Sequence, residues 1–262
     1  MENQKNKPTS SGIKNPDVSR RAFVTKTFLA GAALTIAPLA FVHAGEPIAN
    51  LKNQANNFVY NRNDETKTVL IINTHLTYPG WSEGKLNKSF VDLARKFFIE
   101  QGYKVIETKV EAGYDAAEEV EKHLQADLVI LQTPVNWIST PWIYKKYVDE
   151  VFNSGLQSKK LLSGDGRVAG DPSKQYGTGG NMKGKKFMIC ATWNAAEKDF
   201  NDPSQYLYQG KGPADVFYNI TTNYRFSGYE ILEGYNCFDI FHNTQIKEDL
   251  EKYPAHLKKI IK

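Results

Sequence analysis

Several common functional signatures are missing from this chain of 262 residues. It has only two cysteines, Cys190 and Cys237, and neither has a metal-ligand neighbour, so two core thiols are the simpler interpretation, although the two could pair. The five histidines are scattered rather than placed at metal-ligand spacing, so no metal site is predicted. The body contains no G-x-S-x-G elbow and its first loop no G-x-x-x-x-G-K-[ST] motif, which argues against serine hydrolases and nucleoside-triphosphate hydrolases.

Excess charge is also lacking once the first residues are set aside. Of 33 basic and 29 acidic residues, residues 1–44 hold six and two, which leaves 27 of each. No basic stripe remains, so a nucleic-acid partner is not expected. The apolar run Leu29–Phe41 is too short to span a bilayer comfortably and contains Pro38, which suits the apolar region of a signal peptide.

The start of the chain resembles an export signal of the twin-arginine type at Arg20, Arg21 and Phe23. We predict a signal peptide over residues 1–44 and a periplasmic protein, with the signal cleaved after Ala44 or kept as an anchor at the outer face of the inner membrane. The twin-arginine route carries folded proteins, often with a cofactor inside, so a tightly held cofactor is expected. An ordinary signal peptide with two chance arginines is the alternative.

The rest of the chain divides into a polar linker and one folded body. Residues 45–66 are Asn-rich and without period, which is typical of a linker or arm, whereas residues 67–262 alternate short apolar runs with amphipathic stretches. This rhythm predicts right-handed βαβ units, a parallel sheet and helices on both faces. Strands are expected at 68–73, 103–110, 127–134, 185–193 and within 229–240, and helices at 88–102, 115–125, 141–152 and the C-terminus.

Ligands of open parallel sheets bind beyond the carboxyl ends of the strands. After the first predicted strand, Ser82, Glu83 and Gly84 directly precede a helix, whose free N–H groups would suit a phosphate. The alternative is that Ser82 is only the N-cap of that helix.

Two further strand ends add different chemistry. Trp137 and Trp142 lie in a proline-flanked loop where a flat ring could rest, although two tryptophans are more often part of a core. The third end carries Thr192 and Asn194 beside Trp193, and a glycine-rich segment, residues 176–180, would allow close backbone approach. Together the three ends indicate a phosphate site, a flat-ring site and an amide-rich edge.

Three stretches, "PWIYKKYVDEVF", "DPSKQYGTGG" and "GKKFMICATWNA", resemble the NAD(P)H:quinone reductases of the flavodoxin-like superfamily, in particular the modulator of drug activity B group. The resemblance covers Thr68–Ile261. It implies a flavodoxin-like α/β fold with a doubly wound, five-stranded parallel sheet in the order 2-1-3-4-5. It also implies non-covalent FAD rather than FMN, NAD(P)H as donor, a quinone as acceptor and a homodimer with active sites near the interface.

The same resemblance implies three groups of cofactor contacts. The phosphate loop comprises Ser82, Glu83, Gly84, Lys85, Leu86, Asn87, Lys88 and Ser89; the ring loop comprises Val135, Asn136, Trp137 and Ile138; the remaining flavin contacts are Tyr176, Thr192, Trp193, Asn194 and Ala195. Tyr176 is the candidate catalytic residue, as a hydroxyl donor to the quinone or the flavin, unless it only packs. Family members carry a Gly and a second aromatic where this chain has Val135 and Asn136, so its ring pocket is expected to differ.

The expected function is an FAD-dependent NAD(P)H:quinone oxidoreductase that transfers a hydride from donor to flavin to acceptor. Because NADPH is not expected outside the cytoplasm, an exported flavin-bearing electron carrier with a protein donor is the alternative. A cofactor-free binding protein on the same scaffold is a third hypothesis.

Overall fold

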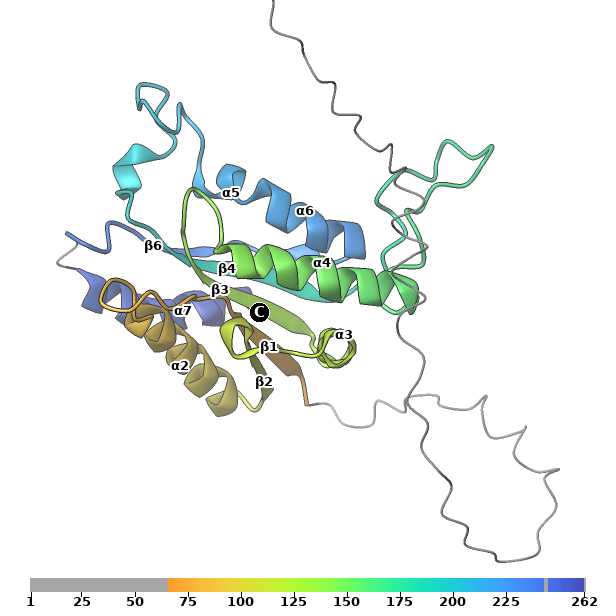
Figure 1. Cartoon of the computed structure of the whole chain (residues 1–262), viewed down its shortest axis with the longest axis horizontal. Coiled ribbons are helices and arrows are strands. Elements are labelled where there is room, and N and C mark those ends of the chain that lie inside the picture. The colour runs from red at the N-terminus through yellow and green to blue at the C-terminus, as the bar shows by residue number, and fades with distance from the viewer. Residues whose placement is uncertain (1–65, 243–244, 262) are drawn as a thin grey trace, which may run out of the picture. The chain divides into compact units, whose positions relative to one another are not determined.

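The computed structural model describes residues 66–242 and 245–261. The predicted signal peptide and residues 45–65 of the predicted linker lie outside this part of the chain. The body contains a parallel sheet in the order β2-β1-β3-β4-β5, which confirms the predicted order (Figure 1). Its first four strands are β1 (Thr68–Asn73), β2 (Lys104–Lys109), β3 (Leu128–Pro134) and β4 (Lys186–Thr192).

The fifth position of the sheet is occupied by two short strands rather than one. Both β5 (Glu230–Ile231) and β6 (Tyr235–Cys237) pair in parallel with β4, one near its start and one near its end. Between them, a Cβ atom on Gly234 would lie 2.8 Å from the carbonyl oxygen of Ile189. The close approach of the two backbones therefore requires glycine at this position.

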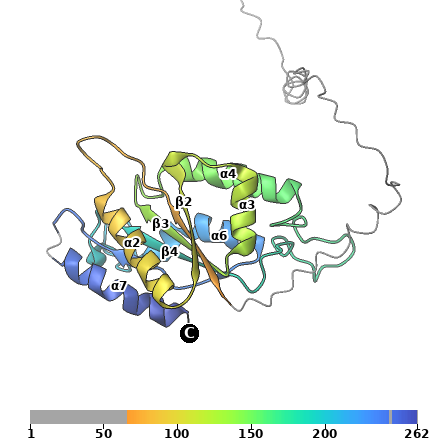
Figure 2. The same ribbon diagram turned by 90° about the horizontal axis from the view of Figure 1, so that it is seen from below.

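Helices cover both faces of the sheet (Figure 2). The helices are α2 (Lys85–Glu100), α3 (Ala116–Gln125), α4 (Trp142–Gln157), α5 (Pro213–Val216), α6 (Tyr218–Ser227) and α7 (Ile246–Ile260), with 3-10 turns η2 (Val110–Ala112) and η3 (Glu197–Asp199). Helices α2 and α7 pack together on one face, and α3, α4 and α6 lie on the other. This is the arrangement that right-handed βαβ connections produce.

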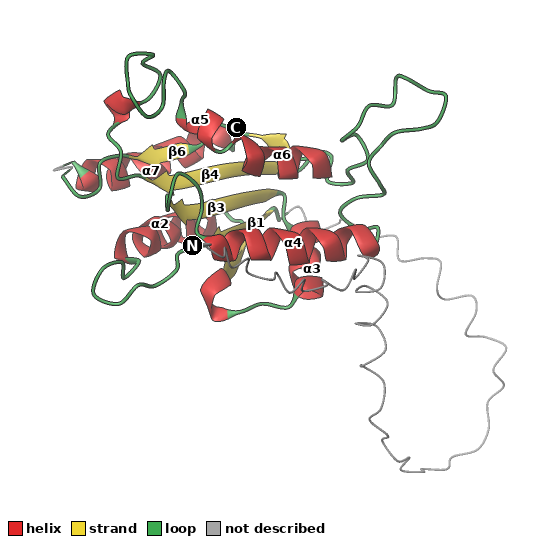
Figure 3. Cartoon of the chain, turned by 45° about the horizontal axis from the view of Figure 1, so that its top comes forward, coloured by secondary structure: helices red, strands yellow, loops and turns green. Residues whose placement is uncertain are grey.

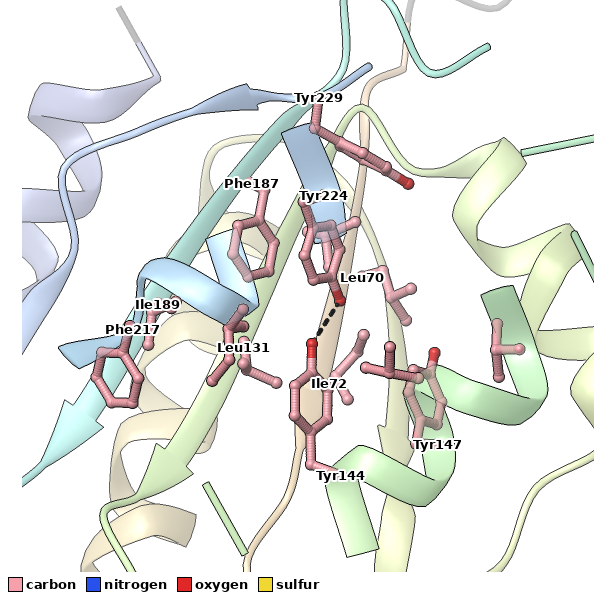
Figure 4. Packing of buried hydrophobic residues seen from close by; sticks show 14 of the residues in the cluster. Leu70, Ile72, Leu131, Tyr144, Tyr147, Phe187, Ile189, Phe217, Tyr224 and Tyr229 are labelled. Carbon is pink, nitrogen blue, oxygen red and sulfur yellow. Dashed lines mark hydrogen bonds between the residues drawn. The ribbon is translucent and has the colours of Figure 1, made fainter. Parts of the chain in front are cut away.

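Alternate residues of β1 point into two separate cores. Val69 and Ile71 join the cluster under α2 and α7, whereas Leu70 and Ile72 join the cluster under α3, α4 and α6. Figure 4 shows the second cluster, in which Tyr144 and Tyr224 meet hydroxyl to hydroxyl at 3.0 Å. The inner strands β1, β3 and β4 are largely apolar because both of their faces are buried.

A buried histidine organises the polar part of this second core. The ring of His123 is fully buried, with Nδ1 2.9 Å from the Tyr229 hydroxyl and Nε2 3.1 Å from the Tyr147 hydroxyl. Tyr147 in turn donates to the carboxylate of Glu119 at 2.8 Å. Every polar atom in the chain Tyr229–His123–Tyr147–Glu119 thus has a partner, as burial requires.

The predicted elements agree with the structure in type, with shifts at helix ends. Helix α2 begins at Lys85 rather than Lys88, and its additional first turn contains Leu86, which packs against the core under α2 and α7. Cys190 and Cys237 are buried free thiols, in line with the simpler interpretation. Within the described residues, no helix has the length and apolar character needed to cross a membrane.

Candidate functional site

The carboxyl ends of β1, β3 and β4 bring three predicted segments together. The amide of Asn87, in the first turn of α2, accepts from Gln132 Nε2 at 2.9 Å and donates to Thr192 Oγ1 at 3.4 Å. Val135 N–H, just after β3, donates to the carbonyl of Thr192 at 2.9 Å. The helix start, the loop after β3 and the end of β4 therefore meet at the carboxyl end of the sheet.

The start of α2 presents backbone N–H groups without a side-chain cap. Its N-cap is Gly84, in a left-handed conformation with φ 72°, and no side chain caps the helix. The first helical bond is that from Lys88 N–H to the Gly84 carbonyl, so the N–H groups of the three preceding residues lie before the helical ladder. Such an end suits an anion. Ser82 is not the N-cap, so that alternative is wrong.

His75, in the first loop, also lies at this site. Its side chain is 3% exposed, and its Nε2 lies 3.1 Å from the hydroxyl oxygen of Ser82. A Cβ atom on Gly84 would lie 2.5 Å from Nδ1 of this ring, so the ring fills the space where any other N-cap residue would need its side chain. Burial lowers the pKa of His75 below its ordinary value, which favours the neutral imidazole.

A pocket of about 280 Å³ lies beside the helix start, between α2 and the end of β2. His75 and Gly84 line it near the loop, and Lys85, Lys88 and Lys109 add positive charge around it. Arg95 also lines the pocket, and Glu83 and Glu107 offset only part of this charge, so the lining keeps a positive excess. Of the predicted phosphate-loop residues, Lys85 and Lys88 are exposed here, while Asn87 is buried.

The loop after β3 contains a strained tight turn. Asn136 N–H donates to the Ser139 carbonyl at 2.7 Å, and the two residues between them, Trp137 and Ile138, have φ of 48° and 62°. Left-handed backbone costs an L-residue about 1–2 kcal/mol, and such strain collects at functional sites. Trp137 is 91% exposed and Trp142 is 64% exposed, so neither belongs to the core.

The residues after β4 divide between core and surface. Trp193 is fully buried, its indole N–H donates to Asn236 Oδ1 at 2.8 Å, and its backbone N–H donates to the Cys237 carbonyl at 2.8 Å. Its side chain is therefore a core residue and does not reach the site edge. Asn194 is exposed and Ala195 is half-buried, which leaves them as the accessible members of the group.

Tyr176 is not brought to this edge. Its ring packs against Phe226, at the end of α6, with centroids 5.2 Å apart, and Arg167 lies over it at 5.1 Å. Met182, a few residues on, donates to the Ser227 carbonyl at 2.9 Å, next to the start of β5. Figure 3 shows the long loop between α4 and β4 at the end of the sheet away from the arrowheads. Within one chain, Tyr176 therefore lies toward the other end of the strands from the remaining candidates.

No group of three or more His, Cys, Asp or Glu side chains suited to hold a metal occurs in residues 66–242 and 245–261. The residues at the edge nevertheless fit a flavin nucleotide. Uncapped N–H groups at α2 would take its phosphate, and the turn at Trp137 and the accessible Asn194 would border its ring. The cradle needs glycine at position 84, since a side chain there would collide with His75.

Comparison with known proteins gives a consistent result. A family model described as flavodoxin-like fold matches residues 67–261. The chain is 38% identical over 181 residues to NADPH:quinone oxidoreductase MdaB of Haemophilus influenzae, an alignment that covers 69% of this chain and 93% of the relative.

Solved structures share the fold at lower identity. A Klebsiella pneumoniae protein solved as a candidate quinone reductase aligns with TM-score 0.60 and 20% identity, over 74% of this chain and 85% of that one. General stress protein 14 of Treponema denticola, in complex with FMN, aligns with TM-score 0.52 and 17% identity, over 74% and 98%.

Proposed function

Since the chain belongs to the flavodoxin-like NAD(P)H:quinone oxidoreductase family, we propose that this oxidoreductase reduces a quinone with two electrons from NADPH through a bound flavin. The observation that carries the proposal is that the uncapped start of α2 and the loop with the strained turn at Trp137 and Ile138 are both hydrogen-bonded to Thr192, at the end of β4. Asn87 links the first of these segments to the end of β4. A phosphate site and a flat-ring site at one sheet edge are what a flavin nucleotide requires.

The chemistry divides between the cofactor and the chain. A bound flavin would supply hydride transfer from NADPH to the quinone, which needs one further proton to become a hydroquinone. The N–H groups at the start of α2 hold the phosphate, and Asn87 fixes that helix relative to β4. The exposed indoles of Trp137 and Trp142 offer planar surfaces beside the ring. No acid or base side chain is needed in this scheme.

The flavin is FAD in this proposal, as the family resemblance implies. A dinucleotide needs room beyond its first phosphate, and the pocket beside Gly84 and Lys88 supplies polar room next to the helix start. Release of the flavin by heat, followed by chromatography against FAD and FMN standards, tests this point. Recovery of FMN alone would contradict it.

The working unit is a homodimer in this proposal. Tyr176 lies at the other end of the strands from the remaining candidates and is 67% exposed. It can therefore serve the site only from a second copy of the chain. Analytical ultracentrifugation tests the oligomeric state, and Tyr176→Phe tests the hydroxyl. A monomer with full activity would contradict this part of the proposal.

The protein is exported to the periplasm in this proposal, on the grounds of the twin-arginine pattern at Arg20 and Arg21. Replacing both by Lys should leave the protein in the cytoplasmic fraction, while the native sequence directs it to the periplasm. The runner-up function, an exported electron carrier with a protein donor, is favoured by the same pattern because NADPH is not expected in that compartment.

The experiment that tests the function uses the purified full chain. A yellow protein whose flavin absorbance bleaches in a stopped-flow mix with NADPH, and recovers on adding a quinone, supports the reductase. Flavin that NADPH leaves oxidised, but that gives a stable one-electron state on dithionite titration, would support the carrier instead. A colourless protein that takes up neither FAD nor FMN would contradict both.

A further inference from the structure

Several hydrogen bonds hold the loop that carries Ser82 and Gly84, in addition to the contact of His75 with Ser82. Thr74 N–H, at its start, donates to the Gln132 carbonyl at 3.0 Å. Near its end, the backbone of Tyr78 and Ser82 is paired in both directions, at 3.0 and 2.8 Å. Between these points, Thr77 bonds to the side chain of Glu111, which follows β2.

The contact between Thr77 and Glu111 uses both carboxylate oxygens. Thr77 N–H donates to Oε1 at 2.6 Å, and the Thr77 hydroxyl donates to Oε2 at 2.9 Å. A charged acceptor makes both bonds stronger than bonds between neutral groups. Burial raises the pKa of Glu111, but the Thr77 bonds and the nearby Lys109 outweigh it, so the pKa lies below its ordinary value and the group is ionised near neutral pH.

The segment that presents Glu111 is itself fixed. Val110 is buried in the core, and Tyr114, just beyond η2, donates its hydroxyl to Glu150 of α4 at 2.7 Å. The Tyr114 ring packs edge-on against Tyr147 of α4, with centroids 5.0 Å apart. Helix α4 begins only a few residues after the strained turn, so both halves of the site are tied to one rigid support.

We infer that Glu111 is a positioning residue of the cofactor site: through Thr77 it holds the loop so that Ser82 and the Gly84 N-cap keep the geometry that binds the flavin phosphate. This inference rests on the proposed flavin function. Glu111 touches neither the helix start nor the strained turn directly; besides Thr77 it contacts Lys109, whose Nζ lies 3.1 Å from Oε2.

The inference separates two parts of the flavin. Holding the loop matters for the phosphate, whereas the ring site is built by the segments after β3 and β4. FAD, which carries phosphate, should therefore lose affinity when the bonds to Thr77 are removed. Riboflavin, which has the same ring and no phosphate, should not.

The test measures dissociation constants of FAD and riboflavin for the full chain stripped of flavin. Loss of two charge-assisted bonds in Glu111→Ala should raise the FAD dissociation constant about tenfold or more. The riboflavin constant should stay within about twofold. Thr77→Val, which keeps the backbone bond, should show a smaller FAD effect, and Thr77→Ser should restore wild-type affinity. The control is Glu121→Gln. Glu121 lies on α3, where it is exposed and forms an ion pair with Lys160, and its substitution should change neither constant.

Each other outcome overturns the inference. Equal losses for FAD and riboflavin in Glu111→Ala would mean a general distortion of the fold, and an unchanged FAD constant would mean that the loop holds itself. If Glu111→Ala fails to fold, the two Thr77 variants decide. An FAD dissociation constant that stays at the wild-type value in Thr77→Val but rises in Thr77→Ser would also overturn the inference. A wild-type chain that binds neither ligand would overturn the proposed function together with this inference, whereas the first two results leave that function standing.

Discussion

Replacing Gly84 by alanine should damage the start of α2 through two separable effects. Its φ of 72° is a left-handed conformation, which costs an alanine about 1–2 kcal/mol. The new Cβ would also lie 2.5 Å from His75 Nδ1, and a forced shift of a packed group typically costs about 1–3 kcal/mol. We therefore expect the free energy of unfolding to fall by about 2–5 kcal/mol.

The same helix offers a matched control at its other end. Gly102 has a φ of 79°, but a Cβ there would meet nothing within 4 Å. Gly102→Ala should therefore cost only the backbone part, about 1–2 kcal/mol. The difference between the two variants, about 1–3 kcal/mol, measures the collision with His75.

Urea unfolding of the flavin-free chain, followed by the fluorescence of the buried Trp193, gives these values. A double-mutant cycle sharpens the test, since His75→Ala removes the ring that the new methyl group meets. In that background Gly84→Ala should cost no more than Gly102→Ala. The reasoning would be refuted if Gly84→Ala cost the same with and without the His75 ring.

Three further predictions concern other parts of the fold. Burial, together with two nearby lysines, lowers the pKa of His123 to about 3, so the unfolded chain takes up a proton between pH 6.5 and 3 that the folded chain does not. The free energy of unfolding should therefore decrease as the pH is lowered through this range, by about 1.4 kcal/mol per pH unit. Urea midpoints should show a shallower pH dependence in His123→Phe. Asn87→Leu leaves the amide of Gln132 without its buried acceptor and should lower the unfolding free energy by about 1–3 kcal/mol; a change below 0.5 kcal/mol would contradict this. Trp137→Gly relieves the left-handed strain that Trp137→Ala keeps, so the Gly variant should be more stable by up to about 1 kcal/mol, and a more stable Ala variant would disprove the strain.

The sheet could be predicted because its strands are buried on both faces. The runs Val69–Ile72 and Leu128–Leu131 are apolar throughout, and the helices between the strands show clear apolar stripes. The fifth strand was harder, since its break at Gly234 depends on how closely the chain passes Ile189 on the neighbouring strand. Such a contact across the sheet has no signal in a single sequence.

The candidate site was predictable where residues follow a strand directly. Thr192 ends β4, and Asn87 reaches it from the first turn of α2, because the helix that follows a parallel strand begins at the carboxyl end of the sheet. Trp193, the residue after Thr192, does not contribute its side chain to the site, because that side chain points into the core. The packing of His75 on Gly84 depends on the path of a long loop, and Tyr176 lies on a segment whose course from α4 back to β4 no local pattern fixes.

The interrupted fifth strand also limits how two chains can associate. A continuous outer strand offers a row of free N–H and C=O groups to which another chain can add, and that route leads to aggregation as readily as to ordered assembly. Here β5 and β6 are short and separated, and the opposite edge, β2, carries Lys104, Glu107 and Lys109. Neither border favours extension of the sheet into a neighbour. A second copy would therefore have to associate through helix faces and loops, which leaves the strand ends open to ligands.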